Sequence, residues 1–295
     1  MMLRIDDLRT GYYKKEIVHG ISFTVDSGDF ACIIGANGCG KTTALKGILG
    51  LLPLYGGSVA VDGRIFAGAA GSGHSGNSGN SGDIGHSAGS GHSGHKNSHA
   101  VRVKDRAKVF AYIPQIHGLP FPFLVSDVVL LGRTPHLQSS VAGPSDADKE
   151  AAYNALEMLG IESIAKESYT ELSGGQQQLV LIARALAQEP KILIMDEPTA
   201  SLDFGNQQLV LDRMQNLSSR GMSVLMVTHD PHHALLCADK VIVMDEGEII
   251  MEGTPEETIT TKMLEKIYGT QVFVTTVQLE SGDSVRTVIP VGRAQ

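Results

Sequence analysis

The sequence has few cysteines, no long apolar run and fewer basic than acidic residues. The three cysteines (Cys32, Cys39 and Cys237) have no Cys-x-x-Cys spacing, which argues against a disulfide framework and favours a reducing compartment. No run approaches the roughly 18 apolar residues of a membrane-spanning helix, and residues 1–7 lack the apolar core of a signal peptide. The net charge of -8 argues against a nucleic-acid partner. We therefore expect a cytosolic protein that can still dock on a membrane partner.

A glycine-rich loop near the N-terminus lies between a predicted strand and a predicted helix. Residues 31–34, Ala-Cys-Ile-Ile, are typical of a buried parallel strand, and residues 43–49 suit a helix. Between them the chain matches the pattern G-x-x-x-x-G-K-[ST] of phosphate-cradling loops. The residues predicted to hold a nucleotide here are Gly35, Asn37, Gly38, Cys39, Gly40, Lys41, Thr42 and Thr43.

Each part of this loop has a physical role toward phosphate. Glycines let the backbone approach the phosphates and turn its N–H groups inward. Lys41 supplies a positive charge for the β- and γ-phosphates, and Thr42 offers a hydroxyl to Mg²⁺, which prefers oxygen ligands. The helix N-terminus that follows favours an anion. The alternative is a glycine-rich turn that matches by chance. The strand, the loop, the lysine, the hydroxyl and the helix are all consistent with a phosphate-binding loop.

Two later strand ends also carry polar residues. Residues 192–195 form a buried-strand pattern that ends in Asp196 and Glu197, and the strand pattern of residues 223–228 ends at His229. Two adjacent carboxylates are costly there unless a cation or a reaction uses them. One could hold Mg²⁺, directly or through water, and the other could activate a water. Strands alternating with helices predict a parallel α/β sheet, which binds ligands at the carboxyl ends of its strands.

Two further features are open to a functional and a plain structural interpretation. In Leu172-Ser173-Gly174-Gly175-Gln176, two glycines before an apolar helix could form a second anion site or a simple helix cap. Tyr12 could stack on a nucleotide base or could be a half-buried surface tyrosine.

Residues 67–100 consist almost entirely of Gly, Ser, His, Asn and Ala. This composition cannot bury enough apolar surface to offset its ordering entropy, so a disordered surface insertion is expected. The alternative is a low-affinity transition-metal buffer. Its histidines are His74, His86, His92, His95 and His99. Their irregular spacing argues against a closed tetrahedral site.

The remaining chain gives simpler expectations. A strand is predicted at 108–113, a helix capped by Ser145, and a hairpin at 241–251. Residues 255–268 are expected to form one charged helix, and residues 271–291 two strands.

Together and in this order, these motifs resemble those of the ATP-binding subunit of ABC transporters. Residues 35–42 resemble the Walker A loop, 172–176 the LSGGQ signature, 192–196 Walker B and 201–203 the D-loop with Asp203. The single residues that match are Gln115 for the Q-loop glutamine, Glu197 for the catalytic glutamate, His229 for the switch histidine and Tyr12 for the base-stacking aromatic.

The resemblance implies a fold and a set of partners. The fold would be the ABC-type P-loop NTPase, with a mainly parallel sheet core, an antiparallel β subdomain and a helical subdomain at about 116–185. The ATP-binding domain would span residues 1–270, followed by a short β tail at 271–295. Two copies would meet head to tail, and closure of this homodimer would drive integral-membrane permease subunits from the cytoplasmic face of the membrane.

The resemblance also implies residue roles. ATP would lie between one subunit's Walker A loop and the other's signature, contributed by Ser173, Gly174, Gly175 and Gln176. Catalysis would fall to Glu197, His229 and Gln115. Mg²⁺ would be served by Thr42, Gln115 and Asp196.

The cargo follows from a narrower resemblance. Residues 125–136 and the run LSGGQQQ are similar to importers of iron–siderophore, haem or cobalamin, which implies an extracytoplasmic substrate-binding protein. The alternatives are a soluble ABC ATPase of cluster assembly, repair or translation, and an ATP-binding regulator without turnover. The insertion at 67–100 departs from the family pattern.

Overall fold

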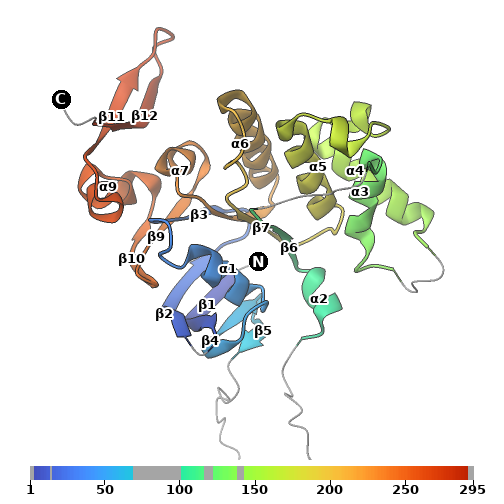
Figure 1. The fold of residues 1–295 in the computed structure, drawn as a ribbon, viewed down its shortest axis with the longest axis horizontal. Coiled ribbons are helices and arrows are strands. Elements are labelled where there is room, and N and C mark those ends of the chain that lie inside the picture. Colours follow the sequence, from blue (N-terminus) through green and yellow to red (C-terminus); the bar gives the residue numbers. More distant parts are fainter. Residues whose placement is uncertain (1–2, 14, 69–100, 116–121, 138–142, 292–295) are drawn as a thin grey trace, which may run out of the picture.

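The computed structural model describes residues 3–13, 15–68, 101–115, 122–137 and 143–291, which form three sheets with helices around them (Figure 1). The strands are β1 (Leu3–Tyr12), β2 (Lys15–Val25), β3 (Phe30–Ile34), β4 (Leu54–Val61), β5 (Arg64–Gly68), β6 (Phe110–Ile113), β7 (Ile192–Asp196), β8 (Ser223–Val227), β9 (Lys240–Asp245), β10 (Glu248–Gly253), β11 (Val272–Gln278) and β12 (Ser284–Pro290). The helices are α1 (Lys41–Ile48), α2 (Val103–Ala107), α3 (Val125–Leu130), α4 (Asp146–Leu159), α5 (Gly174–Leu186), α6 (Phe204–Ser219), α7 (Pro231–Cys237), α8 (Pro255–Thr258) and α9 (Thr261–Tyr268), with 3-10 turns η1 (Leu131–Arg133), η2 (Glu162–Ile164) and η3 (Tyr169–Glu171).

The central sheet has the order β10-β9-β3-β8-β7-β6. Its pairs from β9 to β6 are parallel, and β10 is an antiparallel edge strand joined to β9 by the predicted hairpin. Every residue of β3, β7 and β8 is buried, as the unbroken apolar runs predicted. Because these three strands are neighbours and parallel, the segments that follow them leave the same edge of the sheet.

The two faces of β3 belong to different hydrophobic cores. Ala31 and Ile33 pack with α1 and with the antiparallel sheet, whose order is β2-β1-β4-β5. Cys32 and Ile34 pack with the helices on the other face, among them α5, α6 and α7. This alternation follows from the period of two along a strand. The predicted fold class, a mainly parallel core with an antiparallel β part and a helical part, is confirmed.

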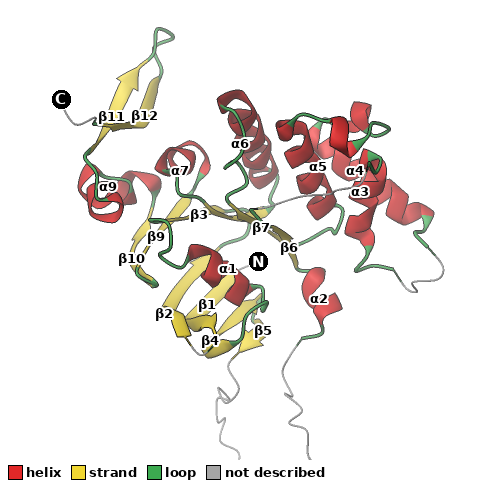
Figure 2. Cartoon of the chain, in the orientation of Figure 1, coloured by secondary structure: helices red, strands yellow, loops and turns green. Residues whose placement is uncertain are grey.

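The helices α3, α4 and α5 gather beyond the β6 edge of the central sheet (Figure 2). Arg133, which is buried, joins them. Its Nε donates to Asp148 Oδ1 at 3.0 Å, and its Nη1 donates to Ala187 O and to Glu189 Oε2, each at 2.7 Å. Asp148 also completes the capping box that Ser145 forms at the start of α4. Hydrogen bonds from Ser145 and from Arg133 lower the pKa of Asp148 to about 2.

Two local predictions are corrected. The expected single helix at 255–268 is two helices, because Thr254 caps α8, Thr260 caps α9, and Ile259 between them points into the core. The strand expected at 108–113 begins at Phe110 and follows the short helix α2, which the sequence did not reveal.

The end of β5 and helix α2 are tied together by Arg106. Its Nη2 donates to Phe66 O at 3.0 Å, and its Nη1 donates to Leu49 O and Gly50 O at 3.1 and 3.2 Å. Ala67 and Gly68, predicted to open the insertion, belong to β5. The insertion's histidines and the proposed metal buffer lie outside the described residues.

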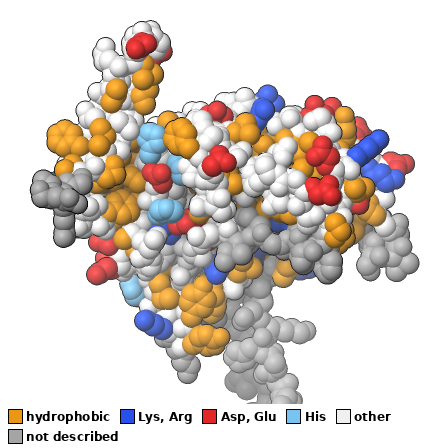
Figure 3. All heavy atoms as spheres, turned by 45° about the horizontal axis from the view of Figure 1, so that its top comes forward, with side chains coloured by type: hydrophobic (Ala, Val, Ile, Leu, Met, Phe, Trp, Pro, Cys, Tyr) orange, Lys and Arg blue, Asp and Glu red, His pale blue; other side chains and the backbone are white. Residues whose placement is uncertain are grey.

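The C-terminal strands β11 and β12 form the predicted hairpin, which projects away from the body. Arg286, in the middle of β12, ties the hairpin to the chain by donating to Glu256 O and Ile259 O. Hydrophobic side chains, Phe273 and Ile289 among those exposed, lie along the hairpin, and acidic side chains lie at its tip (Figure 3). Among the described residues, no helix is long and apolar enough to cross a bilayer.

Candidate nucleotide-binding site

A cleft of about 490 Å³ opens where β3, β7 and β8 end. It is lined by Ile17, Asn37, Gly38, Gly40, Lys41, Thr42, Thr43, Gln115, Glu197, Ala200 and His229. The sequence predicted most of these residues as one site, although they come from segments far apart in the chain. Ile17 and Ala200 were missed, because an aliphatic residue in a strand or loop carries no sequence signal for a ligand.

The phosphate loop leads directly into α1. Gly40 precedes the helix with a φ of 107°, a conformation that side chains rarely adopt. Lys41 is 5% exposed, and its Nζ donates to Gly35 O at 2.7 Å and to Ala36 O at 2.9 Å. No carboxylate lies within 4.0 Å of this Nζ in the part of the chain that the structure describes. A buried cation held only by neutral carbonyls is suited to receive an anion.

Thr42, which lines the cleft, and the buried Asp196 bring two oxygen ligands together. Thr42 Oγ1 donates to Asp196 Oδ1 at 3.0 Å, and Asp196 is 1% exposed. Burial raises the pKa of Asp196, although the Thr42 hydrogen bond opposes the shift. A hydroxyl beside a buried carboxylate is the kind of oxygen set that Mg²⁺ accepts. The residues present therefore fit a magnesium ion.

The side chains of Gln115 and His229 both approach one carboxylate oxygen of Glu197. Glu197 Oε2 accepts from Gln115 Nε2 at 2.9 Å and lies 3.2 Å from His229 Nδ1. Glu197 has a φ of 50°, which is uncommon for a residue with a side chain, and its N–H donates to Val227 O at 2.9 Å. A carboxylate held between an amide and an imidazole, at a backbone position of this kind, is suited to orient a water.

Two tyrosines that the sequence did not single out lie next to site residues: Tyr268 contacts His229, and Tyr112 lies near Asp196. Tyr268 donates its hydroxyl to His229 O at 2.9 Å. Burial and the nearby Asp196 carboxylate raise the pKa of Tyr112, which lies on β6. Neither residue lies in a motif, so only the folded chain reveals them.

The signature residues and Asp203 lie outside this cleft. Ser173 caps α5 and exchanges hydrogen bonds with Gln176 in a capping box. A side chain at Gly175 would place its Cβ 2.1 Å from Asn206 Oδ1. Asn206 in turn donates to Asp203, which caps α6. The glycine is therefore required where the starts of α5 and α6 approach each other, and within one chain these residues do not reach the phosphate loop's cleft.

Four other predicted residues do not line the cleft, and one of them is Asp196, the buried partner of Thr42. Gly35 contributes the carbonyl that holds Lys41, and the Cys39 side chain is buried under the loop. The Tyr12 ring lies 6.0 Å from Lys46 Nζ, and the Tyr12 hydroxyl accepts from that nitrogen at 3.4 Å. In this conformation Tyr12 contacts a lysine of α1.

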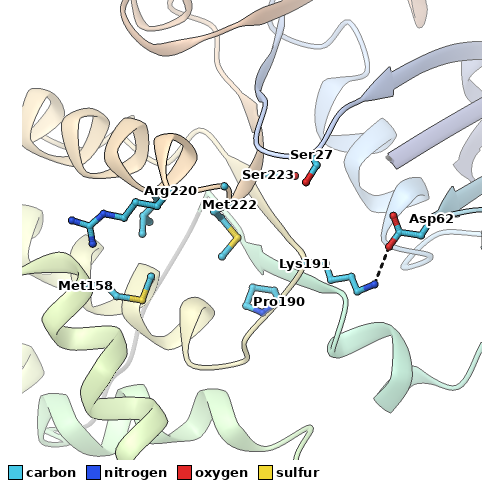
Figure 4. Close-up of a pocket in the computed structure, with 10 residues that line it drawn as sticks. Ser27, Asp62, Met158, Pro190, Lys191, Arg220, Met222 and Ser223 are labelled. Atoms are coloured by element: carbon cyan, nitrogen blue, oxygen red, sulfur yellow. Dashed lines mark hydrogen bonds and ion pairs between the residues drawn. The ribbon is translucent and has the colours of Figure 1, made fainter. Parts of the chain in front are cut away.

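A second cleft, of about 360 Å³, lies at the amino ends of β7 and β8 (Figure 4). It contains no residue that the sequence predicted for a site. Its Lys191 pairs with Asp62 at 2.9 Å, and Met158 of α4 and Met222 lie on its other side. Glu197 and His229, which the sequence predicted at the carboxyl ends of strands, line the first cleft instead.

The comparisons with known proteins agree with this site. Residues 18–200 match the model of the ABC transporter family, and the chain belongs to this family as an ATP-binding subunit and an ATPase. The predicted resemblance is thereby confirmed.

Its relatives include two curated proteins and a solved transporter structure. The chain is 37% identical over 270 residues to an uncharacterized ABC transporter ATP-binding protein of Haemophilus influenzae, covering 92% of the chain and 90% of the relative. It is 31% identical over 275 residues to the iron(3+)-hydroxamate import ATP-binding protein FhuC of Bacillus subtilis, covering 93% of the chain and 90% of the relative. An inward-facing ABC transporter described as metal-chelate type superimposes with a TM-score of 0.77 at 27% identity, covering 99% of this chain and 98% of that one.

Proposed function

We propose that two copies of this chain hydrolyse Mg-ATP between them and thereby drive a membrane permease that imports a metal chelate. The observation that carries the proposal is the division of the site. The buried Lys41 and the Glu197–His229 pair face one cleft, whereas the signature glycines lie outside it. A head-to-tail second copy brings the missing signature to the nucleotide.

In this proposal each part of the cleft has a role. Lys41 and the loop N–H groups bind the phosphates, and Thr42, Asp196 and Gln115 hold Mg²⁺ or its waters. When bound, the metal would supply charge stabilisation for the phosphates during transfer of the γ-phosphoryl group. Glu197 orients and deprotonates the attacking water, and His229 contacts the γ-phosphate. Ser173, Gly174, Gly175 and Gln176 of the second copy close the site, with Asp203 beside them, and Tyr12 turns from Lys46 to meet the base.

The domain organisation belongs to the same proposal. Residues 1–270 form the ATP-binding domain, and its helical subdomain at about 116–185 is the part that touches the permease at the cytoplasmic face of the membrane. Residues 271–295 form a separate tail. The metal-chelate cargo rests on the resemblance of residues 125–136 and on the names of the relatives, and it implies an extracytoplasmic binding protein.

The first test is hydrolysis by Glu197→Gln. Losing the general base should lower kcat by about 10²-fold or more, while the Kd for ATP stays near its wild-type value. Glu248→Gln, an exposed change on β10, is the matched control and should keep full activity. Unchanged hydrolysis by Glu197→Gln would remove Glu197 from the mechanism.

The second test identifies the partners. Glu197→Gln, loaded with Mg-ATP, is used as bait in detergent-solubilised membranes of its host, and captured proteins are identified by mass spectrometry. A polytopic permease with a binding-protein companion supports the importer. Recovery of soluble assembly or repair factors alone would contradict the proposed role in transport. It would not affect the proposal that the protein hydrolyses ATP.

A further inference from the structure

A buried imidazole lies behind the two loops that carry Glu197 and His229. His233 belongs to α7 and is 6% exposed. Its Nδ1 lies 3.2 Å from Thr228 Oγ1 and 3.4 Å from Thr199 Oγ1. Thr228 immediately precedes His229, and Thr199 follows Glu197 by two positions. One ring nitrogen therefore contacts both loops.

The surroundings of the other ring nitrogen favour one tautomer of His233. His233 Nε2 lies 3.5 Å from Asp230 Oδ2. A carboxylate can only accept a hydrogen bond, so the imidazole proton belongs on Nε2. Nδ1 is then an acceptor that faces the two threonine hydroxyls, and Thr228 Oγ1 also lies 3.5 Å from Asp230 O. Burial lowers the pKa of His233, which keeps the ring neutral.

The threonines are themselves fixed to their loops. Thr228 Oγ1 accepts from Asp230 N at 3.1 Å, and Asp230 caps α7 by accepting from His232 N at 2.8 Å. On the other loop, Gln207 of α6 donates to Thr199 O at 3.2 Å, and the next residue, Ala200, lines the cleft. A shift of the imidazole would therefore be passed to both walls of the cleft.

We propose that His233 is a positioning residue for ATP hydrolysis, holding the loop of Glu197 and the loop of His229 at a fixed separation through the hydroxyls of Thr199 and Thr228. This inference rests on the proposed function of Glu197 and His229. His233 itself does not line the cleft. Its effect is on the geometry of the 3.2 Å contact between Glu197 and His229.

The state of charge of His233 matters to this role. A protonated ring would carry hydrogen on Nδ1 and could no longer accept from the two hydroxyls. The titratable groups that face it are Asp230, which favours the charged ring, and His232 and His229, which disfavour it. Acid should therefore loosen the two loops, as protons bind His233.

The experiment compares two substitutions of His233 in the full chain. His233→Asn places an amide oxygen near the position of Nδ1 and keeps an acceptor, whereas His233→Leu removes it. The Leu variant should lose about 10-fold to 10²-fold in kcat, because small misplacements of catalytic groups cost that much. The KM for ATP should stay unchanged, and the Asn variant should recover most of the lost kcat.

A second pair of variants keeps the test decisive if His233→Leu fails to fold. Thr199→Val removes the hydroxyl at constant shape, and Thr199→Ser retains it. The Val variant should repeat the fall in kcat, and the Ser variant should not. The acid limb of the pH–kcat profile should also shift in His233→Asn relative to wild type, since Asp230, His232 and His229 remain in both.

Full activity of His233→Leu, or an equal fall in both members of either pair, overturns the inference. A fall in kcat that only follows a fall in Tm does so as well. The proposed function is judged separately: if Glu197→Gln is inactive while His233→Leu is fully active, only the positioning role fails.

Discussion

Two positive side chains are buried to nearly the same extent in different regions of this molecule. Lys41 of the phosphate loop is 5% exposed, and Arg133 among the helices is 7% exposed. Arg133 has Asp148 at 3.0 Å and Glu189 at 2.7 Å. Among the described residues, Lys41 Nζ has backbone carbonyls as its hydrogen-bond partners.

The difference separates a structural charge from a functional one. Removing a cation from water is costly, and nearby carboxylates offset that cost. Arg133 carries its compensation within the chain and so ties α4 to the end of α5. Lys41 lacks it, which is tolerable only if the compensation arrives with a ligand. The proposed nucleotide supplies that negative charge.

The largest expected effect is on stability and comes from substituting Arg133, the buried cation with carboxylate partners. Arg133→Met should lower the free energy of unfolding by about 3–5 kcal/mol, because it removes the hydrogen bonds of a buried guanidinium to two carboxylates and to Ala187 O. Urea unfolding measures this, and the exposed Arg220→Met, which should change stability by less than about 0.5 kcal/mol, is the control. The double variant with Asp148→Asn should lose less than the sum of the singles. An additive loss would contradict the ion-pair account.

The next effect is on ATP hydrolysis and comes from substituting Lys41, the buried cation of the phosphate loop. Lys41→Met should lower kcat for ATP hydrolysis by about 10²-fold to 10³-fold, since it removes a donor aimed at developing negative charge. The free energy of unfolding should stay the same or rise, because an uncompensated buried cation is removed. The exposed Lys149→Met serves as control. If Lys41→Met unfolds as readily as Arg133→Met, the contrast between the two cations is wrong.

The contribution of Asp148, the carboxylate partner of Arg133, to stability should depend on pH. The folded-state pKa of Asp148 is about 2, below the ordinary 3.8, so its charge favours the folded state. The contribution is fully present above pH 3.8 and is lost as the pH falls through about 2. The stability difference between wild type and Asp148→Asn, measured by urea unfolding, should therefore shrink across that window. A difference independent of pH would rule out this origin.

The smallest effect concerns Cys39, which lies beside Lys41 in the loop. Burial raises the pKa of its thiol, although Lys41 opposes the shift. Cys39 should therefore react more slowly with iodoacetamide than an exposed thiol does, and faster as the pH rises. Mass spectrometry follows the adduct, and Cys39→Ser identifies the site. Rapid modification at neutral pH would show that the loop opens readily.

How much the sequence predicts depends on whether a feature is local in the chain. The loop at 35–42, the buried strands and the cap at Ser145 are short patterns with a fixed spacing, and all were predicted. The convergence of Lys41, Glu197 and His229 followed from the rule that parallel strands end at one edge.

Features that join distant segments were not predicted. The partners of Arg133 lie 15 and 56 residues away, and His233 reaches Thr199 across 34 residues. Nothing in the local sequence specifies such pairs. The break between α8 and α9 was missed because the charge pattern of 255–268 concealed the second cap at Thr260. The contact of Tyr12 with Lys46 depends on a rotamer, which spacing does not encode.

The tie that Arg106 makes between β5 and α2 has a practical consequence. Because the guanidinium of Arg106 in α2 binds the carbonyls of Leu49, Gly50 and Phe66, the described residues on either side of 69–100 are held together. The entropy of closing a loop grows only slowly with its length. A fluorescent reporter or an affinity module could therefore replace residues 69–100 while Arg106 keeps the flanking residues together. The transporter could then be labelled at an internal position, with both termini unchanged.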